Sequence, residues 1–241
     1  MAAAPRPAPR RERARAATID EIKHTALDLM RAHGSIDIKF TDIARVMELT
    51  PPALYRYFAD RDALLNVLIA DGYQALGRAV ALAREAVPEG DVWSRFLAIA
   101  QAYRRYARDE PQLFTLILGM PVAGYVAPED GPTTEAAQGA MQELSRVFVD
   151  AMRLGVLGAP MVDEVHADLV AHKAEKHHDA DPVPAANFQA MLHCWAMLHG
   201  FTTLEAYGHF DWITEKARDS LFVDHVALAA RAAGIPVPER R

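Results

Sequence analysis

Residues 40–65 read FTDIARVMELTPPALYRYFADRDALL, and this stretch contains two short helical patterns separated by a turn. The first pattern runs from about Thr41 to Met47. The second begins at Thr50-Pro51, which is typical of a helix start because proline lacks only an amide that the first helical turn leaves unpaired. Leu54 and Phe58 lie four residues apart in it, on a face that we expect to be buried. Two short helices joined by a tight turn predict a helix-turn-helix unit.

A helix-turn-helix unit binds DNA by placing the N-terminal residues of its second helix against base edges in the major groove. The exposed side chains of this helix supply hydroxyl groups for phosphate oxygens and, in Arg56, a guanidinium for a phosphate or a guanine edge. Pro51 and Pro52 offer only apolar contact, for example to a thymine methyl group. The candidate DNA contacts of this stretch are Lys39, Thr41, Thr50, Pro51, Pro52, Ala53, Tyr55, Arg56 and Tyr57.

The sequence on both sides of this unit is also helical in pattern. Upstream, Thr18 and Glu21 form a capping box that predicts a helix start, and Gly34 predicts the end of that helix. Downstream, Asp60 is placed to cap a helix that ends at Pro88. We expect further helices at about 92–108, 113–120, 133–155, 162–177, 185–207 and 211–233. The sequence therefore predicts an all-α fold, with an N-terminal three-helix DNA-binding domain followed by a C-terminal helical domain.

The charged residues are divided unevenly along the chain, whose net charge is −6. Residues 1–65 carry a net charge of +2 and the remainder a net charge of −8. Five arginines and one glutamate lie within residues 1–15, together with prolines at positions 5, 7 and 9 that oppose a helix. We expect this segment to be a disordered basic arm. Composition leaves open whether the arm is only solvated or lies along DNA phosphates.

Composition and motifs exclude several classes of protein. A single cysteine, Cys194, excludes a disulfide framework and a four-thiolate zinc site. No apolar run reaches the roughly 18 residues of a membrane span, and the N-terminus is unlike a secretory signal, so we expect a cytoplasmic location. The sequence lacks a nucleophile elbow, a phosphate-binding loop and a metal signature, so we expect neither an enzyme nor a cofactor. The histidines at 166, 172, 177 and 178 are interpreted as a solvated helix end, which leaves metal binding there undecided.

The N-terminal pattern resembles that of the tetracycline-repressor (TetR) family of bacterial regulators. The resemblance covers about residues 15–75. It rests on Phe40-Thr41-Asp42-Ile43-Ala44-Arg45, Leu49-Thr50, Ala53-Leu54-Tyr55-Arg56-Tyr57-Phe58 and Asp60-Arg61-Asp62-Ala63-Leu64-Leu65. It implies one further DNA contact, Arg61, where the family usually has lysine. Glu48 stands where the family's turn usually carries glycine, and we do not count it among the contacts.

In this family the C-terminal helices bind a small effector and form a dimer, and the stretch from Trp195 to Glu205 resembles a motif of one subclass. The helix at about 185–207 is apolar over most of its circumference, so we expect it to face both its own domain and a twin subunit. The predicted dimer contacts are Trp195, Leu198 and Thr202. Large side chains on inward faces favour an apolar effector with few polar anchors, although a plain core would show the same residues. The candidate pocket residues are Trp93, Phe96, Tyr103, Phe114, Met120, Phe148, Met152, His193 and Met197.

The expected protein is a DNA-binding transcriptional regulator. In the first hypothesis it is a ligand-responsive repressor that binds a palindromic operator as a dimer and is released by a small apolar effector. In the alternative it binds no small molecule, and its C-terminal helices serve dimerisation only. An enzyme with an appended DNA-binding module has little support. The expected segments are the basic arm at 1–15, the DNA-binding domain at 16–62, the regulatory and dimerisation domain at 63–233 and a tail at 234–241.

Overall fold

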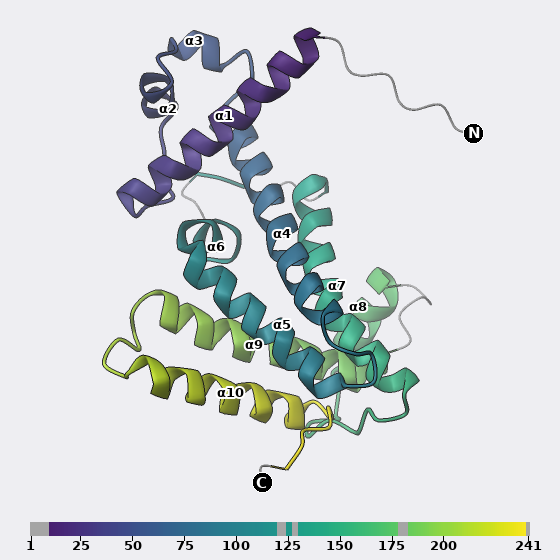
Figure 1. Cartoon of the computed structure of the whole chain (residues 1–241). Helices are drawn as coiled ribbons and strands as arrows, with labels where there is room; N and C mark the ends of the chain where they lie inside the picture. Colours follow the sequence, from purple (N-terminus) through teal and green to yellow (C-terminus); the bar gives the residue numbers. More distant parts are fainter. Residues whose placement is uncertain (1–9, 120–123, 127–129, 178–182, 240–241) are drawn as a thin grey trace, which may run out of the picture. The chain divides into compact units, whose positions relative to one another are not determined.

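The computed structural model describes residues 10–119, 124–126, 130–177 and 183–239, and over these residues it holds helices and no strand (Figure 1). The helices are α1 (Arg10–His33), α2 (Phe40–Val46), α3 (Pro51–Leu54), α4 (Arg61–Glu85), α5 (Val92–Asp109), α6 (Pro111–Leu118), α7 (Pro132–Arg153), α8 (Ala167–His177), α9 (Ala185–Ala206) and α10 (Glu215–Ala232). The predicted all-α fold is confirmed. The chain divides into an N-terminal unit, residues 1–72 with 112–134, and a C-terminal unit, residues 73–111 with 135–241. Their boundary lies within α4, between Gly72 and Tyr73, whereas the sequence places it at 62/63.

Helix α1 begins at Arg10 and not at the capping box predicted for Thr18. Residues 10–17 are rich in arginine and alanine, which are strong helix formers, and no proline interrupts them after position 9. The Thr18 hydroxyl donates a hydrogen bond to the Ala14 carbonyl, 3.0 Å away, as threonine does inside a helix. The prediction of a disordered arm is therefore wrong for residues 10–15, while residues 1–9 lie outside the described part of the chain.

The core of the N-terminal unit is a set of apolar side chains from α1, α2, α3 and the first half of α4. In α1 the residues Ile22, Ala26 and Met30 recur at helical spacing and are fully buried. The other buried apolar side chains of this part are Phe40, Ile43 and Ala44 of α2, Leu54 of α3, Phe58, and Leu64, Leu65 and Leu68 of α4. At the start of α4 the Asp60 carboxylate accepts a hydrogen bond from the Ala63 amide at 2.7 Å, which confirms the predicted cap. This packing determines how α2 and α3 are presented.

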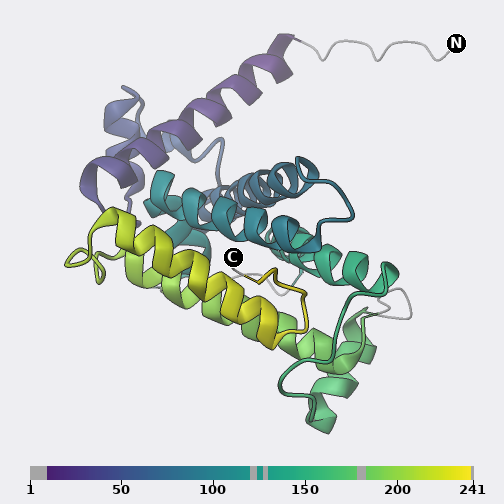
Figure 2. The same cartoon turned by 60° about the horizontal axis from the view of Figure 1, so that its bottom comes forward.

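In the C-terminal unit α5, α9 and α10 pack against one another, and the three run side by side in both views (Figures 1 and 2). Phe96, Phe148 and Phe222 are fully buried in this unit. Buried arginines join its helices to each other through carboxylates. These pairs are Arg84–Glu143 at 2.9 Å, Arg95–Asp150 at 2.7 Å and the bidentate pair Arg104–Glu205 at 2.6 and 2.5 Å.

The chain segment that follows α10 folds back into the C-terminal unit. The Gly158 amide donates to the Gly234 carbonyl at 2.8 Å, and the Met161 amide donates to the Ala232 carbonyl at 2.7 Å. Gly234 has a φ of 81°, and a β-carbon on it would lie 2.2 Å from the Gly158 carbonyl oxygen, so only glycine fits. Ile235 is also buried. The tail predicted to start at residue 234 therefore contributes its first two residues to the fold.

Candidate nucleic-acid interface

The turn between α2 and α3 depends on one left-handed residue. The Leu49 amide donates to the Ala44 carbonyl at 2.8 Å, and this bond closes the end of α2. Glu48 has a φ of 53°, and among the described residues it is the one non-glycine with a positive φ. A glycine would adopt this conformation without strain, which explains in physical terms why glycine suits this position.

In α3 and the turns that follow it, buried and exposed side chains are separated as the sequence predicts. Leu54 and Phe58 are buried, while Tyr55 and Arg56 are exposed. The Tyr55 ring lies 5.2 Å from the Phe40 ring of α2, measured between centroids, which orients it without burying it. Thr50, Pro51 and Pro52 are also exposed, and Ala53 and Tyr57 are half-buried. The helical hydrogen bonding ends sooner than predicted, because α3 stops at Leu54 and residues 55–57 form turns.

The start of α2 adds further exposed polar groups. Lys39 occupies the N-cap position in extended backbone, and the side chains of Lys39 and Thr41 are exposed. Thr50 precedes α3 in the same way but makes no side-chain capping bond, which leaves its hydroxyl free of that task. Both hydroxyls and the ammonium group are of the kind that contacts phosphate oxygens.

Arg61 differs from the other candidate contacts because the protein itself binds its guanidinium. Its Nε donates to the Ile38 carbonyl at 3.1 Å, and one Nη pairs with the Asp37 carboxylate at 2.9 Å. The side chain is half-buried. These contacts hold the segment before α2 against the start of α4. Sequence reasoning missed this structural role because 24 residues separate the two charged groups.

The candidate pocket residues differ in burial and belong to both units of the chain. Phe96 and Phe148 are fully buried and Trp93, Met152 and Met197 are half-buried in the C-terminal unit. Phe114 belongs to the N-terminal unit, and Met120 lies outside the described residues. His193 is exposed, so its prediction as an inward-facing pocket residue is wrong.

Tyr103 is at the centre of a polar cluster that sequence reasoning did not identify. Its hydroxyl is 2.9 Å from Nδ1 of His199, whose ring stacks on Trp195 at 5.7 Å between centroids. Thr203 Oγ1 lies 3.4 Å from the other ring nitrogen of His199. Burial raises the pKa of Tyr103 and lowers the pKa of His199, so both groups are neutral near pH 7. Neutral hydroxyl and imidazole groups are suitable anchors for an uncharged ligand.

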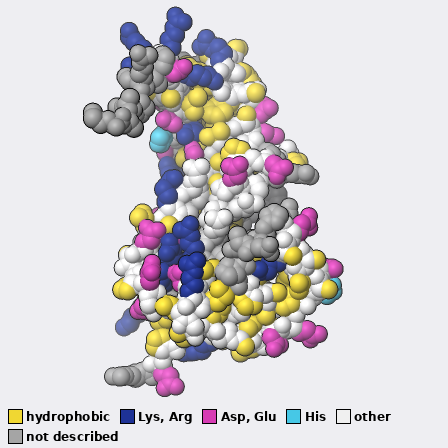
Figure 3. All heavy atoms as spheres, turned by 90° about the vertical axis from the view of Figure 1, so that its right-hand side faces the viewer, with side chains coloured by type: hydrophobic (Ala, Val, Ile, Leu, Met, Phe, Trp, Pro, Cys, Tyr) yellow, Lys and Arg dark blue, Asp and Glu magenta, His cyan; other side chains and the backbone are white. Residues whose placement is uncertain are grey.

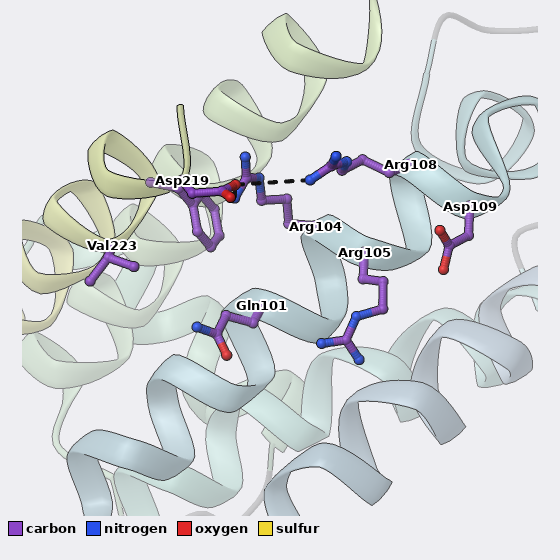
Figure 4. A pocket seen from close by; sticks show the side chains of 8 residues that line it. Gln101, Arg104, Arg105, Arg108, Asp109, Asp219 and Val223 are labelled. Carbon is purple, nitrogen blue, oxygen red and sulfur yellow. Dashed lines mark ion pairs between the residues drawn. The ribbon is translucent and has the colours of Figure 1, made fainter. Parts of the chain in front are cut away.

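A surface pocket of about 420 Å³ between α5 and α10 has a different chemistry (Figure 4). It is lined by Gln101, Arg104, Arg105, Arg108, Asp109, Asp219, Phe222 and Val223. Asp219 pairs with Arg104 at 2.8 Å, and the Arg104 guanidinium lies over the Phe222 ring at 4.7 Å. Arg108 pairs with Glu215 at 2.8 Å. None of the residues predicted for an apolar pocket lines this charged hollow.

The predicted dimer contacts face the interior of the chain. Leu198 and Thr202 are 5% and 1% exposed, so their prediction as interface residues is wrong, and Trp195 is half-buried. They share a face of α9 with Glu205, which pairs with Arg104 of α5. The outward face of α9 instead presents His193, Ala196, Gly200 and Leu204, and Tyr207 is exposed directly after the helix. The spacing identified residues that share one face of α9, but it did not indicate which face of the helix is exposed.

The sequence shows neither an apolar run long enough to span a membrane nor a metal-binding motif, and the described residues bear on both points. Within them no helix is long and apolar enough to cross a membrane. Within them, too, no group of three or more histidine, cysteine, aspartate or glutamate side chains could hold a metal ion. His166 and His172 are exposed, while His178 lies outside the described part and nothing is described of the His177 side chain.

Comparisons with known proteins find relatives that are named as transcriptional regulators of the helix-turn-helix type. The family model described as the tetracyclin repressor-like C-terminal domain matches residues 96–229. The HTH-type transcriptional regulator Rv1816 of Mycobacterium tuberculosis is 30% identical over 191 residues, which cover 76% of this chain and 79% of that protein. The regulator Mb1846 of Mycobacterium bovis matches equally well.

Solved structures show the same fold. The structure of the regulatory protein SCO4313 has a TM-score of 0.72 and 29% identity, and the match covers 92% of this chain and 98% of that one. The TetR-family regulator PfmR of Thermus thermophilus has a TM-score of 0.53 and 16% identity, with 87% and 97% covered. The family model spans more than half of the chain and the relatives are regulators rather than enzymes. The chain belongs to the TetR family of transcriptional regulators.

Proposed function

We propose that the chain represses transcription as a homodimer, which binds a palindromic operator through α2 and α3 and releases it when a small apolar effector binds. The observation that carries the DNA-binding part is the arrangement of α3 and the turns that follow it, where buried Leu54 and Phe58 hold exposed Tyr55 and Arg56 outward. A single unit of this kind contacts few base pairs, and two-fold symmetry doubles the site.

The DNA contacts are tested with an operator selected from a random duplex pool by the parent protein. Arg56→Ala and Tyr55→Phe should each weaken binding to that duplex at matched salt, the first by about 1–3 kcal/mol if Arg56 contacts a base. Tyr55→Phe keeps the ring that contacts Phe40 and removes only the hydroxyl group. Arg153→Ala, at an exposed position in α7, is the matched control. Binding by both variants that is as tight as the parent's would show that α3 is not the reading helix.

The outward faces of α9 and α10 support the proposed dimer. Gly200 has open space where a β-carbon would stand, and Leu204, Leu221 and Leu228 are about half exposed. A small residue one helical turn from an exposed leucine suits close packing of a second copy's helices. Leu204→Asp with Leu228→Asp should yield monomers in light scattering, whereas Leu82→Asp, at an exposed leucine of α4, should not. A monomeric parent protein at micromolar concentration would contradict the dimer.

The half-buried Trp93, Met152 and Met197 support an apolar effector, and Tyr103 and His199 could supply its few polar contacts. Such a ligand releases DNA only if it prefers a conformation in which the two reading helices are wrongly spaced. Helix α4 is our candidate for the connecting element, because a packed helix moves as a rigid body. A coupling of about 1–3 kcal/mol would weaken DNA binding roughly 5- to 150-fold.

The effector is tested by a thermal-shift screen of small apolar compounds, followed by titration of each hit with and without operator. Reciprocity requires the operator to weaken ligand binding by the same factor by which the ligand weakens operator binding. Equal ligand affinity in both titrations would favour the alternative, a regulator without an inducer. That alternative has its own support, because Phe96 and Phe148 fill the core with no exposed surface.

A further inference from the structure

We propose that the first turns of α1 form a second DNA-binding element, in which Arg10, Arg11 and Arg13 contact phosphates beside the base pairs that α3 reads. The proposal rests on the proposed DNA-binding function and extends it to a segment outside the helix-turn-helix. The ligand is the DNA backbone, so the contacts carry affinity rather than sequence preference.

Arg15 connects this segment to the recognition helix. Its guanidinium donates a hydrogen bond to the Arg56 carbonyl at 3.1 Å and lies over the Tyr57 ring, 5.4 Å from the centroid. Arg56 and Tyr57 lie in the turns after α3, beyond its C-cap Tyr55, and the side chain of Arg56 is a candidate DNA contact. Two independent contacts from one side chain therefore place α1 against the end of the reading helix. All of these residues belong to the N-terminal unit.

Apart from the two contacts of Arg15, the segment before Thr18 buries no side chain that would favour a helix. Residues 10–17 are exposed throughout, and the first buried residue of α1 is Ile22. Twelve residues separate Ile22 from Arg10, so the helix runs about 18 Å beyond its first buried residue. An exposed helical extension of this kind is stabilised by little besides intrinsic propensity. A bound partner would supply the missing contacts.

The charge of the extension identifies the partner. Residues 10–15 hold four arginines and one acid, Glu12. Dark blue arginine and lysine side chains crowd this end of α1 in Figure 3. Arg11 lies one turn before Arg15 on the same face, about 6 Å along the axis, and Arg10 and Arg13 flank that face. Within the described residues no ion pair involves Arg10, Arg11 or Arg13, so their guanidinium groups face solvent. A row of exposed arginines beside a reading helix fits a row of phosphates.

The test measures how the affinity for DNA depends on salt, because each phosphate contact contributes about 0.9 to the slope of log K against log salt. Phosphate contacts are independent of sequence, so a labelled duplex of mixed sequence serves as the probe. Full-length parent protein and the variant R10A/R11A/R13A are titrated by fluorescence anisotropy between roughly 50 and 200 mM salt. Three lost contacts should lower the slope by about 2.7 for each subunit that contacts the duplex, and each such loss makes the salt effect over that range roughly 40-fold smaller.

Two further variants separate a phosphate contact from a general effect of charge or folding. R78A/R105A/R153A removes three exposed arginines from the C-terminal unit and should leave the slope unchanged. R10K/R11K/R13K keeps the charges and should restore most of the slope. Alanine favours helix, so circular dichroism of R10A/R11A/R13A should match the parent.

The outcomes distinguish this inference from the proposed function. A slope for R10A/R11A/R13A equal to the parent's, or an equal loss in R78A/R105A/R153A, overturns the inference and leaves DNA binding by α3 intact. A parent protein that binds no duplex overturns the proposed function itself. A smaller slope restored by lysine supports the second element.

Discussion

Replacing Glu48 by glycine should stabilise the N-terminal unit and strengthen DNA binding at the same time. Glu48 has a φ of 53° in the turn before α3, and this left-handed backbone conformation is strained in a residue that has a β-carbon. A left-handed non-glycine residue costs about 1–2 kcal/mol, and glycine loses about 0.5–1 kcal/mol more conformational entropy on folding than alanine does. The free energy of unfolding should therefore rise by about 0.5–1 kcal/mol in the glycine variant.

Glu48→Ala separates the backbone effect from the charge effect. Alanine removes the exposed carboxylate but keeps the β-carbon, so the strain in the turn remains. We expect Glu48→Gly to be more stable than Glu48→Ala by about 1 kcal/mol, because alanine is unfavourable where φ is positive. Both variants remove a negative charge two residues before Thr50, so both should bind a duplex more tightly than the parent at low salt.

Urea denaturation followed by circular dichroism measures the first effect, and fluorescence anisotropy with a labelled duplex measures the second. If the alanine variant is as stable as the glycine variant, the backbone conformation of Glu48 costs nothing and the reasoning fails. If neither variant binds DNA more tightly than the parent, the carboxylate lies away from the phosphates, and the turn is not at the interface.

Three further predictions concern the C-terminal unit. Glu205→Ala should lower the free energy of unfolding by about 3–5 kcal/mol, measured by urea denaturation, because it leaves the buried Arg104 guanidinium without its bidentate partner. Asp219→Ala removes a more exposed carboxylate from the same guanidinium and should lower it by less. Burial lowers the pKa of His199, so the unfolded chain binds its proton more readily; stability should fall as the pH drops below about 6.5, and less steeply in His199→Gln. Gly234→Ala should destabilise the protein by more than about 1 kcal/mol in the same assay, because its β-carbon would meet the Gly158 carbonyl, while Gly139→Ala in α7, where the space is open, should not.

The helix-turn-helix was predictable from sequence because its signals are local. Leu54 and Phe58 share a face by spacing alone, and the Asp60 cap needs only the next three residues. The start of α1 was not predictable in this way, because two local signals compete. The capping box at Thr18 favours a start there, while the arginine and alanine residues before it favour a longer helix, and the longer helix forms.

The C-terminal unit was predictable in its helices but not in their contacts. Helix α9 is apolar around its circumference, so periodicity does not distinguish the side that meets α5 and α10 from the side that faces outward. The partner of Arg104 lies 101 residues away in sequence, and nothing near either residue indicates the pair. Contacts of this kind depend on tertiary packing. For the same reason the sequence did not show that Leu198 and Thr202, the predicted dimer contacts, lie on the buried face of α9.

Helix α4 bears on how an effector could act on DNA, because its two halves belong to different units. Its first half carries buried Leu64, Leu65 and Leu68, and ends at Gly72, whose missing β-carbon would lie 2.8 Å from the Ile117 side chain of α6. Helices α4 and α6 are therefore in close contact within the N-terminal unit. In the C-terminal unit the buried pair Arg84–Glu143 ties the other half of α4 to α7. In the proposed effector response, a ligand that shifts α7 would act on α4 through the Arg84–Glu143 pair.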